Sequence, residues 1–341
     1  MKTWIIPAGS TAGAQALKLT ERSSPEPGPG EIKIALKAWS LNYRDRMVAS
    51  GRYVFGPVTR DTVPLSDGAG EIVAVGRNVT EWKIGDRVVG TFFQNWLSGP
   101  FISEILRSDL GGPIDGMLAE EVVLAAHGVV RISDHLSFEQ AATLPCAALT
   151  AWNAIFEVAK LRAGQALLTL GTGGVSIFAL QLAKLAGVSV ISTSSSNQKL
   201  ERLGALGAAH TINYREIPEW HTEVLRLTGG RGVDAVIEVG GPGTLEKSIL
   251  AVTPGGTIGL IGVLSEPGAK IDPRKLIAKS ITLRGVYVGS RAMFLDMNRA
   301  ISAASLKPVI GRVFSFEDAP AAYEYMATGA HVGKIVIARG A

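Results

Sequence analysis

The chain is poor in the residues that form disulfides and metal sites. Cys146 is the single cysteine among 341 residues, so an internal disulfide cannot form and a cysteine-based metal site is excluded. A lone cysteine is typical of a reducing compartment, which predicts a cytoplasmic protein, and Cys146 is expected to be a small buried packing residue. The five histidines are scattered, without the paired spacing of metal ligands.

Long apolar runs and runs of one charge are lacking too. The segment 166–183 carries no charged residue, but three glycines interrupt it, and a membrane span needs about 20 predominantly apolar residues. The N-terminal residues lack the apolar core of a signal peptide. The net charge of +4 is spread along the chain without a basic stripe, so neither a membrane nor a nucleic acid is an expected partner.

Glycine, in contrast, is abundant, with 40 residues, and the length predicts two domains. The first 125 residues or so are rich in strand patterns. Alternation of charged and apolar residues predicts a half-buried strand over Glu31–Ala38, and two further strand-like runs follow at Gly70–Val75 and Arg87–Gly90. The Pro- and Gly-rich residues 25–30 must form a loop.

The pattern changes near residue 135. Ser137 is predicted to cap a helix, and short apolar strands then alternate with amphipathic helices. This alternation predicts an α/β fold, a doubly wound parallel sheet covered on both faces. A helix over Met293–Ser302 and a strand over Gly333–Ala338 are expected to return to the first domain. The six strands predicted for the sheet are Ala166–Leu170, Val188–Ser192, His210–Asn213, Val233–Glu238, Gly256–Ile261 and Ile281–Tyr287.

A glycine motif follows the first of these strands and opens a helix. Gly171 permits a tight turn, and Gly173 has no side chain to keep a pyrophosphate from the backbone. The helix N-terminus supplies unpaired N–H groups for the phosphates. Ser176 stands where the third glycine of such motifs is usual. The predicted dinucleotide contacts of this motif are Gly171, Thr172, Gly173, Gly174 and Val175.

The end of the second strand of the sheet predicts which dinucleotide is bound. An NAD site usually places Asp or Glu there, but this strand runs into serines, and no acid comes before Glu201. Hydroxyls and an ammonium group can bind a 2′-phosphate, so NADP(H) is favoured over NAD(H). The candidate ligands are Ser194, Ser195 and Lys199, with Tyr214 or Arg215 as a lid; the alternative is a solvated serine-rich turn.

Several short motifs in a fixed order make the chain similar to the medium-chain dehydrogenase/reductase superfamily over essentially its whole length. The motifs are Pro27-Gly28-Pro29-Gly30-Glu31, Leu41-Asn42-Tyr43-Arg44-Asp45, Asp67-Gly68-Ala69-Gly70-Glu71-Ile72, Gly85-Asp86-Arg87-Val88, 144–152, the glycine motif and His331-Val332-Gly333-Lys334-Ile335-Val336. The resemblance implies a Rossmann domain over 127–290 and a GroES-like β-rich domain formed by both chain ends, 1–126 and 291–341. It also implies a homodimer.

The chain departs from the zinc-dependent members of that superfamily. They carry a catalytic Cys just after the third early strand and a Gly-His-Glu before the next glycines, where this chain has Asn42-Tyr43-Arg44-Asp45 and Ser66-Asp67-Gly68. The region of their structural zinc lobe, about 93–115, has no cysteine here. The sequence therefore predicts no zinc and resembles the zinc-independent, quinone-oxidoreductase-like branch. Without a Lewis acid, substrates that accept hydride readily, such as quinones and α,β-unsaturated carbonyls, are favoured.

The resemblance also suggests residues beside the nicotinamide. Asn42 is a candidate to bind a cofactor ribose or the substrate oxygen, and Tyr43 is either a proton donor or only a pocket wall. Arg44 and Asp45 are expected to form a salt bridge. Thr150 is either a nicotinamide contact or a helix threonine bonded to its own backbone, and Lys334 is either a cofactor contact or an exposed strand lysine.

Further cofactor contacts are expected at the carboxyl ends of the later strands, where ligands of such sheets lie. Substrate pocket walls are expected from 48–60 and 92–110. The expected strand-end contacts are Val239, Gly240, Ile261, Gly262, Val263, Val286, Tyr287 and Val288.

Three functions are compatible with these residues. The first is NADPH-dependent reduction of a quinone or an α,β-unsaturated carbonyl without zinc. The second is a zinc-free alcohol dehydrogenase acting on an unidentified alcohol. The third is an NADPH-binding protein with a structural or regulatory role, without enzymatic activity.

Overall fold

The chain forms two compact units in the computed structural model, which describes residues 1–262, 264 and 271–340. One unit combines Met1–Leu149 with the residues from Gly289 onward, and the other is the continuous segment Thr150–Val288. Both ends of the chain therefore build the first unit, whereas the second is inserted between them. Among the described residues, no helix is long and apolar enough to cross a membrane.

The first unit is built on a seven-stranded sheet. Its strands follow the order β14-β15-β3-β4-β5-β7, β6 pairs with β3, and β1 and β2 form a separate antiparallel pair. The strands are β1 (Lys2–Ile5), β2 (Lys18–Glu21), β3 (Glu31–Leu41), β4 (Asp67–Val75), β5 (Arg87–Gly90), β6 (Glu121–Ala125), β7 (Val129–Arg131), β14 (Ile310–Ser315) and β15 (Lys334–Ala338). The helices are α1 (Tyr43–Ala49), α2 (Phe138–Ala142), α9 (Arg291–Ala303) and α10 (Ala319–Ala327), and α3 (Leu149–Trp152) crosses the unit boundary.

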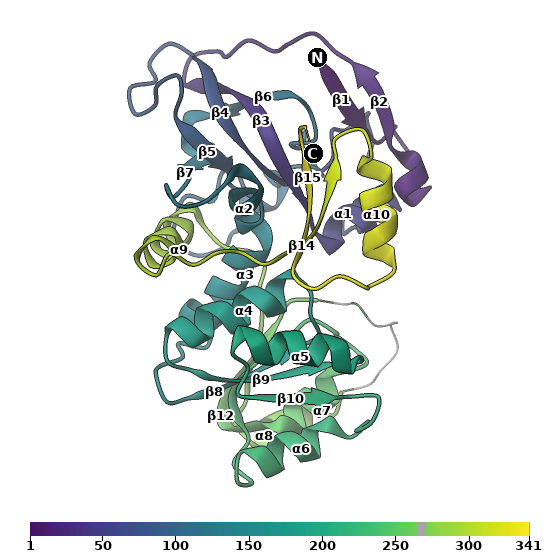
Figure 1. The fold of residues 1–341 in the computed structure, drawn as a ribbon, viewed down its shortest axis with the longest axis vertical. Helices are drawn as coiled ribbons and strands as arrows, with labels where there is room; N and C mark the ends of the chain where they lie inside the picture. The colour runs from purple at the N-terminus through teal and green to yellow at the C-terminus, as the bar shows by residue number, and fades with distance from the viewer. Residues whose placement is uncertain (263, 265–270, 341) are drawn as a thin grey trace. The chain divides into compact units, whose positions relative to one another are not determined.

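Strand β3 is the centre of this sheet and joins the two ends of the chain. The predicted strand over Glu31–Ala38 is confirmed and continues to Leu41. It is antiparallel to β15, with Ile335 opposite Leu41 and Ala338 opposite Ala38. Figure 1 shows the yellow C-terminal strand β15 beside the purple β3. Residues at the two ends of the chain thereby become neighbours in one buried layer.

Residues 127–149 belong to the first unit, whereas the sequence analysis assigns them to the second. In the structure, β7 pairs with β5, and α2 packs against β3 and β4. These contacts join residues far apart in the chain, so the sequence pattern does not reveal them. The helix start at Ser137 is confirmed, since its Oγ accepts a hydrogen bond from the Gln140 N–H at 3.2 Å. The first unit therefore extends to Leu149 before the chain enters the second.

The second unit has a six-stranded parallel sheet, as predicted. Its order is β10-β9-β8-β11-β12-β13, the doubly wound arrangement in which the chain reverses direction across the sheet between β8 and β11. The strands are β8 (Ala166–Leu170), β9 (Ser189–Ser194), β10 (His210–Asn213), β11 (Val233–Glu238), β12 (Val252–Leu260) and β13 (Thr282–Gly285). The helices are α4 (Gly174–Leu185), α5 (Asn197–Leu206), α6 (Trp220–Leu227), α7 (Leu245–Ala251) and α8 (Pro273–Ala278).

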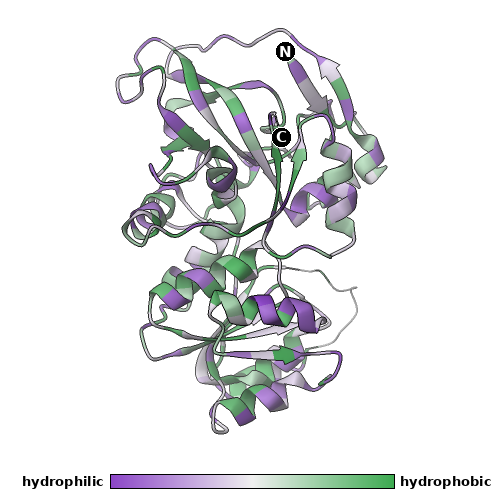
Figure 2. Cartoon of the chain, viewed as in Figure 1, coloured by the Kyte–Doolittle hydropathy of each residue, from purple (hydrophilic) through white to green (hydrophobic). Residues whose placement is uncertain are grey.

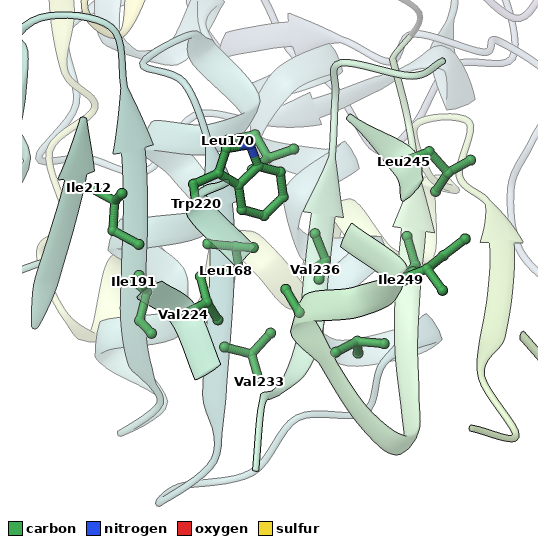
Figure 3. Packing of buried hydrophobic residues seen from close by; sticks show 13 residues of the cluster. Leu168, Leu170, Ile191, Ile212, Trp220, Val224, Val233, Val236, Leu245 and Ile249 are labelled. Carbon is green, nitrogen blue, oxygen red and sulfur yellow. The ribbon is translucent and has the colours of Figure 1, made fainter. Parts of the chain in front are cut away.

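Buried side chains from strands and helices hold this sheet in place. In Figure 3, Trp220 and Val224 of α6 and Ile249 of α7 pack over the strand residues Leu168 and Val236. Helix α5, in contrast, carries mostly hydrophilic residues in Figure 2 and buries Leu200 and Leu203. The helix contacts fix the strands, and the strands in turn place the loops at their carboxyl ends.

Two π-helical segments were not predicted from the sequence. They cover Leu144–Ala148 and Asn153–Val158, on either side of the short helix α3. A π-helical turn widens the helix by one residue and is frequent at functional sites. Cys146 and Thr150 both lie in this irregular helical stretch.

Candidate functional site

The glycine motif forms the loop between β8 and α4. Gly171 has φ +73°, a left-handed conformation that glycine adopts at little cost, and its N–H donates to Thr193 O at 2.9 Å. Gly173 caps α4 and Gly174 begins it, so the loop ends at a helix N-terminus. Thr172 and Val175 complete the predicted set in this loop, beside the point where the strand order reverses.

The surroundings of Gly173 indicate that this loop can accommodate a dinucleotide. Its φ is ordinary, −71°, and apart from Gly173 and its two chain neighbours no atom of the described residues lies within 4 Å of the place that a Cβ would take. Neither backbone conformation nor packing of the described residues therefore requires glycine there. A pyrophosphate approaching the backbone N–H groups of the helix N-terminus would require it, so the loop fits that group.

Ser176 takes the place of the third glycine without opening a gap. It is 2% exposed, and its Oγ donates to Leu170 O at 2.6 Å, across the junction of β8 and α4. The hydroxyl thus gives the carbonyl of Leu170, the last residue of β8, a hydrogen-bond donor from α4. The serine therefore ties helix to strand and keeps their close packing.

The residues predicted to bind a 2′-phosphate lie at the end of β9 and in the turn after β10. Ser194 is buried, Ser195 is half-buried, and the Tyr214 N–H donates to Ser194 O at 3.0 Å. Lys199 lies half-buried in α5, and burial lowers the pKa of its ammonium group. Ser194 and Tyr214 are thus brought together, and Lys199 lies on the helix that follows.

A carboxylate that the sequence analysis did not consider lies in the turn after β10. Glu216 Oε1 accepts hydrogen bonds from Asn197 Nδ2 at 2.8 Å and from Asn213 Nδ2 at 2.9 Å. Asn213 Nδ2 also donates to Asn197 Oδ1 at 2.7 Å. Glu216 therefore fastens the start of α5 to β10, with two amide donors already on one of its oxygens.

Glu238 is a second residue that sequence reasoning missed. This carboxylate at the end of β11 is fully buried, and Oε1 accepts from the N–H groups of Gly240 at 2.8 Å and Gly241 at 3.0 Å. It also accepts from the hydroxyls of Thr244 and Ser248. Glu238 thereby organises the loop in which Val239 and Gly240 were predicted to contact the cofactor.

The later strand ends carry the remaining predicted contacts. Gly262 needs to be glycine, because a Cβ there would lie 2.1 Å from Val239 O. Val263 lies outside the described residues, whereas Ile261 donates its N–H to Glu238 O at 2.8 Å. Ile261 and Gly262 therefore lie against the loop that follows β11.

Val288 is the most strained residue of this set. It follows Val286 and Tyr287 and has φ +55°, a left-handed conformation that is an outlier for a β-branched residue. Its carbonyl accepts a hydrogen bond from Asn153 Nδ2 at 2.7 Å. Such strain persists only where the surroundings enforce it, and it clusters at functional sites.

The first unit holds a buried group of four polar side chains, which we call the polar ring: Asn42, Ser66, Asp67 and Lys334. Lys334 Nζ donates to Leu41 O at 2.7 Å and to Asn42 Oδ1 at 2.5 Å, and it lies 3.8 Å from Asp67 Oδ2. Ser66 Oγ donates to Asp67 Oδ1 at 2.7 Å and accepts from Asn42 Nδ2 at 3.5 Å. Lys334 is 3% exposed, so its prediction as an exposed strand lysine is wrong.

Arg44 forms a second buried network. The predicted salt bridge to Asp45 is confirmed at 3.3 Å, but a shorter contact joins Arg44 Nη2 to Asp109 Oδ2 at 2.6 Å. Tyr53 OH donates to the same Asp109 oxygen at 3.2 Å, and the guanidinium lies 4.5 Å from the Tyr53 ring centroid. This network anchors α1, whose N-cap is Asn42.

Tyr43 is placed differently from Asn42. It is 41% exposed at the start of α1, and the Arg46 guanidinium lies 5.7 Å from its ring centroid. A cavity of about 320 Å³ in the same unit is lined by Val48 of α1 and by Tyr53, with others from the predicted wall 48–60. Arg107 is its lining residue from the predicted wall 92–110.

Burial dominates the proton equilibria of this unit. It raises the pKa of Asp45 to about 6, although Arg44 opposes the shift. Burial also raises the pKa of Asp67, which the Lys334 ammonium partly offsets, and that of the Cys146 thiol. A thiol with a raised pKa is a poor nucleophile at neutral pH. Cys146 is half-buried, however, so the prediction of a buried residue is not met.

The residues present do not fit a zinc ion. Within the described part of the chain, no group of three or more His, Cys, Asp or Glu side chains could hold a metal. Asp67, the buried acid of the polar ring, faces the Lys334 ammonium. A cation of the protein's own is thus already paired with this acid.

Two family models match two separate parts of the chain. Residues 28–134 match the alcohol dehydrogenase GroES-like domain, and residues 174–303 match the zinc-binding dehydrogenase. A zinc-type alcohol dehydrogenase-like protein of Schizosaccharomyces pombe is 44% identical over 96% of each chain. A quinone oxidoreductase of Pseudomonas aeruginosa is 30% identical and aligns over 95% of this chain and 96% of its own.

Solved structures agree with this relationship. An NAD-dependent alcohol dehydrogenase has a TM-score of 0.91 at 33% identity, with full coverage of both chains. A mycobacterial protein complexed with NADPH has a TM-score of 0.83 at 26% identity, covering 99% of this chain and 100% of its own. The fold and these relatives define an oxidoreductase with a Rossmann sheet and a GroES-like domain. The chain belongs to the medium-chain dehydrogenase/reductase superfamily.

Proposed function

We propose that the protein is an NADP(H)-dependent, zinc-independent oxidoreductase that transfers hydride between NADPH and a quinone or an α,β-unsaturated carbonyl. The observation that carries the proposal is the polar ring, in which Lys334 pairs with Asp67 and with Asn42. Its charges are balanced by the protein itself. A substrate that accepts hydride without a Lewis acid suits such a site.

NADPH would supply the hydride. In the reductive direction, bound NADPH would deliver a hydride, with its two electrons, to a carbon of the substrate and would be oxidised, and the electron pair displaced in the substrate would move to the substrate oxygen. Water or a nearby hydroxyl then supplies a proton. The residues of this chain would orient the two reactants and hydrogen-bond the developing oxyanion, with Asn42 and Tyr43 as the candidates for that contact.

The preference for NADP(H) rests on the end of β9. Ser194 ends that strand and Ser195 follows it, where an acid would repel a 2′-phosphate, and Lys199 lies further on in α5. The nearby acid, Glu216, has two amide donors on its Oε1, so its charge is partly compensated. Lys199 has its pKa lowered by burial, and a bound phosphate would offset that cost.

Substitution of Lys199 tests this preference. We expect Lys199→Ala to raise the Kd for NADPH about tenfold while changing the Kd for NADH less than twofold, because one charge-assisted contact to the 2′-phosphate is lost. Calorimetric titration measures both constants. Lys184→Ala, on the neighbouring α4, is the control and should leave both unchanged. An equal loss for both dinucleotides would contradict the assignment.

The activity itself is tested by NADPH oxidation with quinones and enals as substrates. The full chain is dialysed against 1,10-phenanthroline, and its metal content is measured before the assay. We expect turnover that the chelator does not change. Loss of turnover with the chelator and its return on addition of zinc would overturn zinc independence, and no turnover with any of these substrates despite NADPH binding would overturn the substrate class.

A zinc-free alcohol dehydrogenase is the second candidate. The similarity to a protein described as an NAD-dependent alcohol dehydrogenase, and to one described as zinc-type alcohol dehydrogenase-like, favours it. This reading requires alcohol-dependent reduction of NAD⁺ or NADP⁺ by the chelated protein. A panel of primary and secondary alcohols assayed in that direction separates it from the first candidate.

We further propose that the protein works as a homodimer in the cytoplasm. The family resemblance supports the dimer, and the single cysteine, Cys146, is in keeping with a reducing compartment. Sedimentation equilibrium of the purified chain measures the mass of the assembly. A monomer at micromolar concentration would contradict the dimer.

A further inference from the structure

Lys334 makes contacts that restrict how Asn42 can act. An ammonium group has three N–H donors and no acceptor, and Lys334 directs its donors at Leu41 O, at Asn42 Oδ1 and toward Asp67. Because Lys334 can only donate, the atom of the Asn42 amide that faces it must be the oxygen. The orientation of this amide is therefore determined by its chemistry.

The opposite atom of that amide, Nδ2, must then point away from Lys334. It donates to Ser66 Oγ over 3.5 Å, a long contact, and Ser66 in turn donates to Asp67. Nδ2 carries two hydrogens. This side of the amide also interacts with the neighbouring Asp67 carboxylate. Asn42 is buried, like Asp67, with 7% of the residue exposed.

We propose that Lys334 is a positioning residue that makes Asn42 a hydrogen-bond donor to the substrate oxygen rather than an acceptor. The ammonium 2.5 Å from Oδ1 also polarises the amide, which strengthens the donor at Nδ2. This inference rests on the proposed function and deepens it, since it assigns a role to the polar ring.

The donor role fits the charge that develops during hydride transfer. When hydride reaches the carbon of a quinone or an enone, negative charge develops on the carbonyl oxygen, and an aimed N–H stabilises it. The reverse reaction passes through the same transition state, so this contact lowers the barrier in both directions. In the reductive direction, water supplies the final proton.

Asn42→Asp separates donor from acceptor at nearly constant shape. The aspartate keeps oxygens for Lys334 but has no N–H for a substrate. We expect kcat for quinone reduction to fall at least 100-fold, with the Kd for NADPH changed less than threefold. If NADPH binding falls as much as kcat/KM, Asn42 contacts the cofactor ribose, and the proposal is overturned.

Lys334→Met tests the positioning step, with Lys334→Arg as the conservative rescue. We expect about a tenfold loss of kcat in the first and partial recovery in the second. Lys37→Met, which removes an exposed lysine of β3, is the control and should leave kcat unchanged. Full kcat in Lys334→Met would overturn the role of the lysine.

A spectroscopic readout keeps this test independent of activity. In protein labelled with ¹⁵N-asparagine, the Asn42 side-chain amide signals are identified by their absence from Asn42→Asp. We expect Lys334→Met to shift these signals and speed their hydrogen exchange, and Lys334→Arg to restore them. Unchanged signals would overturn the proposal, whereas a wild-type protein inactive on every quinone and enone, with the shift present, would overturn only the proposed function.

Discussion

The two units differ in the polar groups that they place at their candidate sites. In the second unit, the polar groups at the glycine loop are backbone N–H groups at the start of α4, and Glu238 organises the neighbouring loop by accepting backbone hydrogen bonds. In the first unit, side-chain charges are buried and already paired, as in Arg44 with Asp109 and Lys334 with Asp67. The glycine loop of the second unit thus presents backbone donors, whereas the buried charges of the first unit are neutralised within the protein.

This contrast teaches where substitutions should act. Removing a partner from a buried ion pair leaves an uncompensated charge, so the first unit should lose stability. Adding bulk to the open glycine loop should spare stability and block binding.

Arg44→Met should give the largest effect, about 3–5 kcal/mol of unfolding free energy, because Asp109 and Asp45 lose their buried partner. Urea denaturation measures it. Arg299→Met, which breaks an exposed pair with Asp296, is the control and should cost less than about 1 kcal/mol. A loss equally small in both variants would show that burial does not separate these pairs.

Gly173→Val should weaken NADPH binding at least 100-fold, because the side chain would fill the space that a pyrophosphate needs. Unfolding free energy should fall by only about 1 kcal/mol, from the poorer N-cap. Gly204→Ala, also without a neighbour within 4 Å of its Cβ position, is the matched control and should bind normally. Unimpaired binding by Gly173→Val would place the dinucleotide elsewhere.

Asp45 should make stability depend on pH. Its pKa of about 6 in the folded chain lies above the ordinary value of 3.8, so the folded state holds its proton more tightly than the unfolded state. The unfolding free energy should therefore fall as pH rises from about 4 to about 6, by roughly 2 kcal/mol, and then level off. The difference between wild type and Asp45→Asn, measured by urea titration at each pH, isolates this residue. A difference independent of pH would contradict the raised pKa.

Asn153→Leu should have the smallest effect, about 1 kcal/mol, because the buried Val288 carbonyl loses its donor. Thermal unfolding measures the loss. Since Val288 is held in a left-handed conformation, hydrogen exchange of its neighbourhood should also rise. Thr222→Ala, which removes an exposed hydroxyl bonded to Glu219 O, is the control with little expected change.

Local pattern was enough to predict much of the second unit. Ala166–Leu170, His210–Asn213 and Val233–Glu238 are strands with the predicted bounds, because short apolar runs between turn signals leave few alternatives. The glycine loop was also predicted from local sequence, because adjacent residues, Gly171 to Gly174, indicate both a tight turn and the start of a helix.

The polar networks of the first unit were not predictable in this way. Arg44 and Asp109 are 65 residues apart, and Lys334 and Asn42 are 292 apart, so only the folded sheet brings them together. The π-helical segments and the short strands β1, β2 and β7 carry no distinctive periodicity. Glu238 was missed because nothing in its flanking residues distinguishes a buried loop-organising acid from a solvated one.

The pairing of β15 with β3 has a consequence for how the protein is made. On the ribosome, residues 150–288 emerge as one stretch and hold all six strands of their sheet before the last strand is synthesised. Asp67 and Asn42 are synthesised long before Lys334, which belongs to the C-terminal strand β15. A nascent chain halted before that strand would hold all six strands of the second unit, whereas Asp67 of the first unit would lack its ammonium partner.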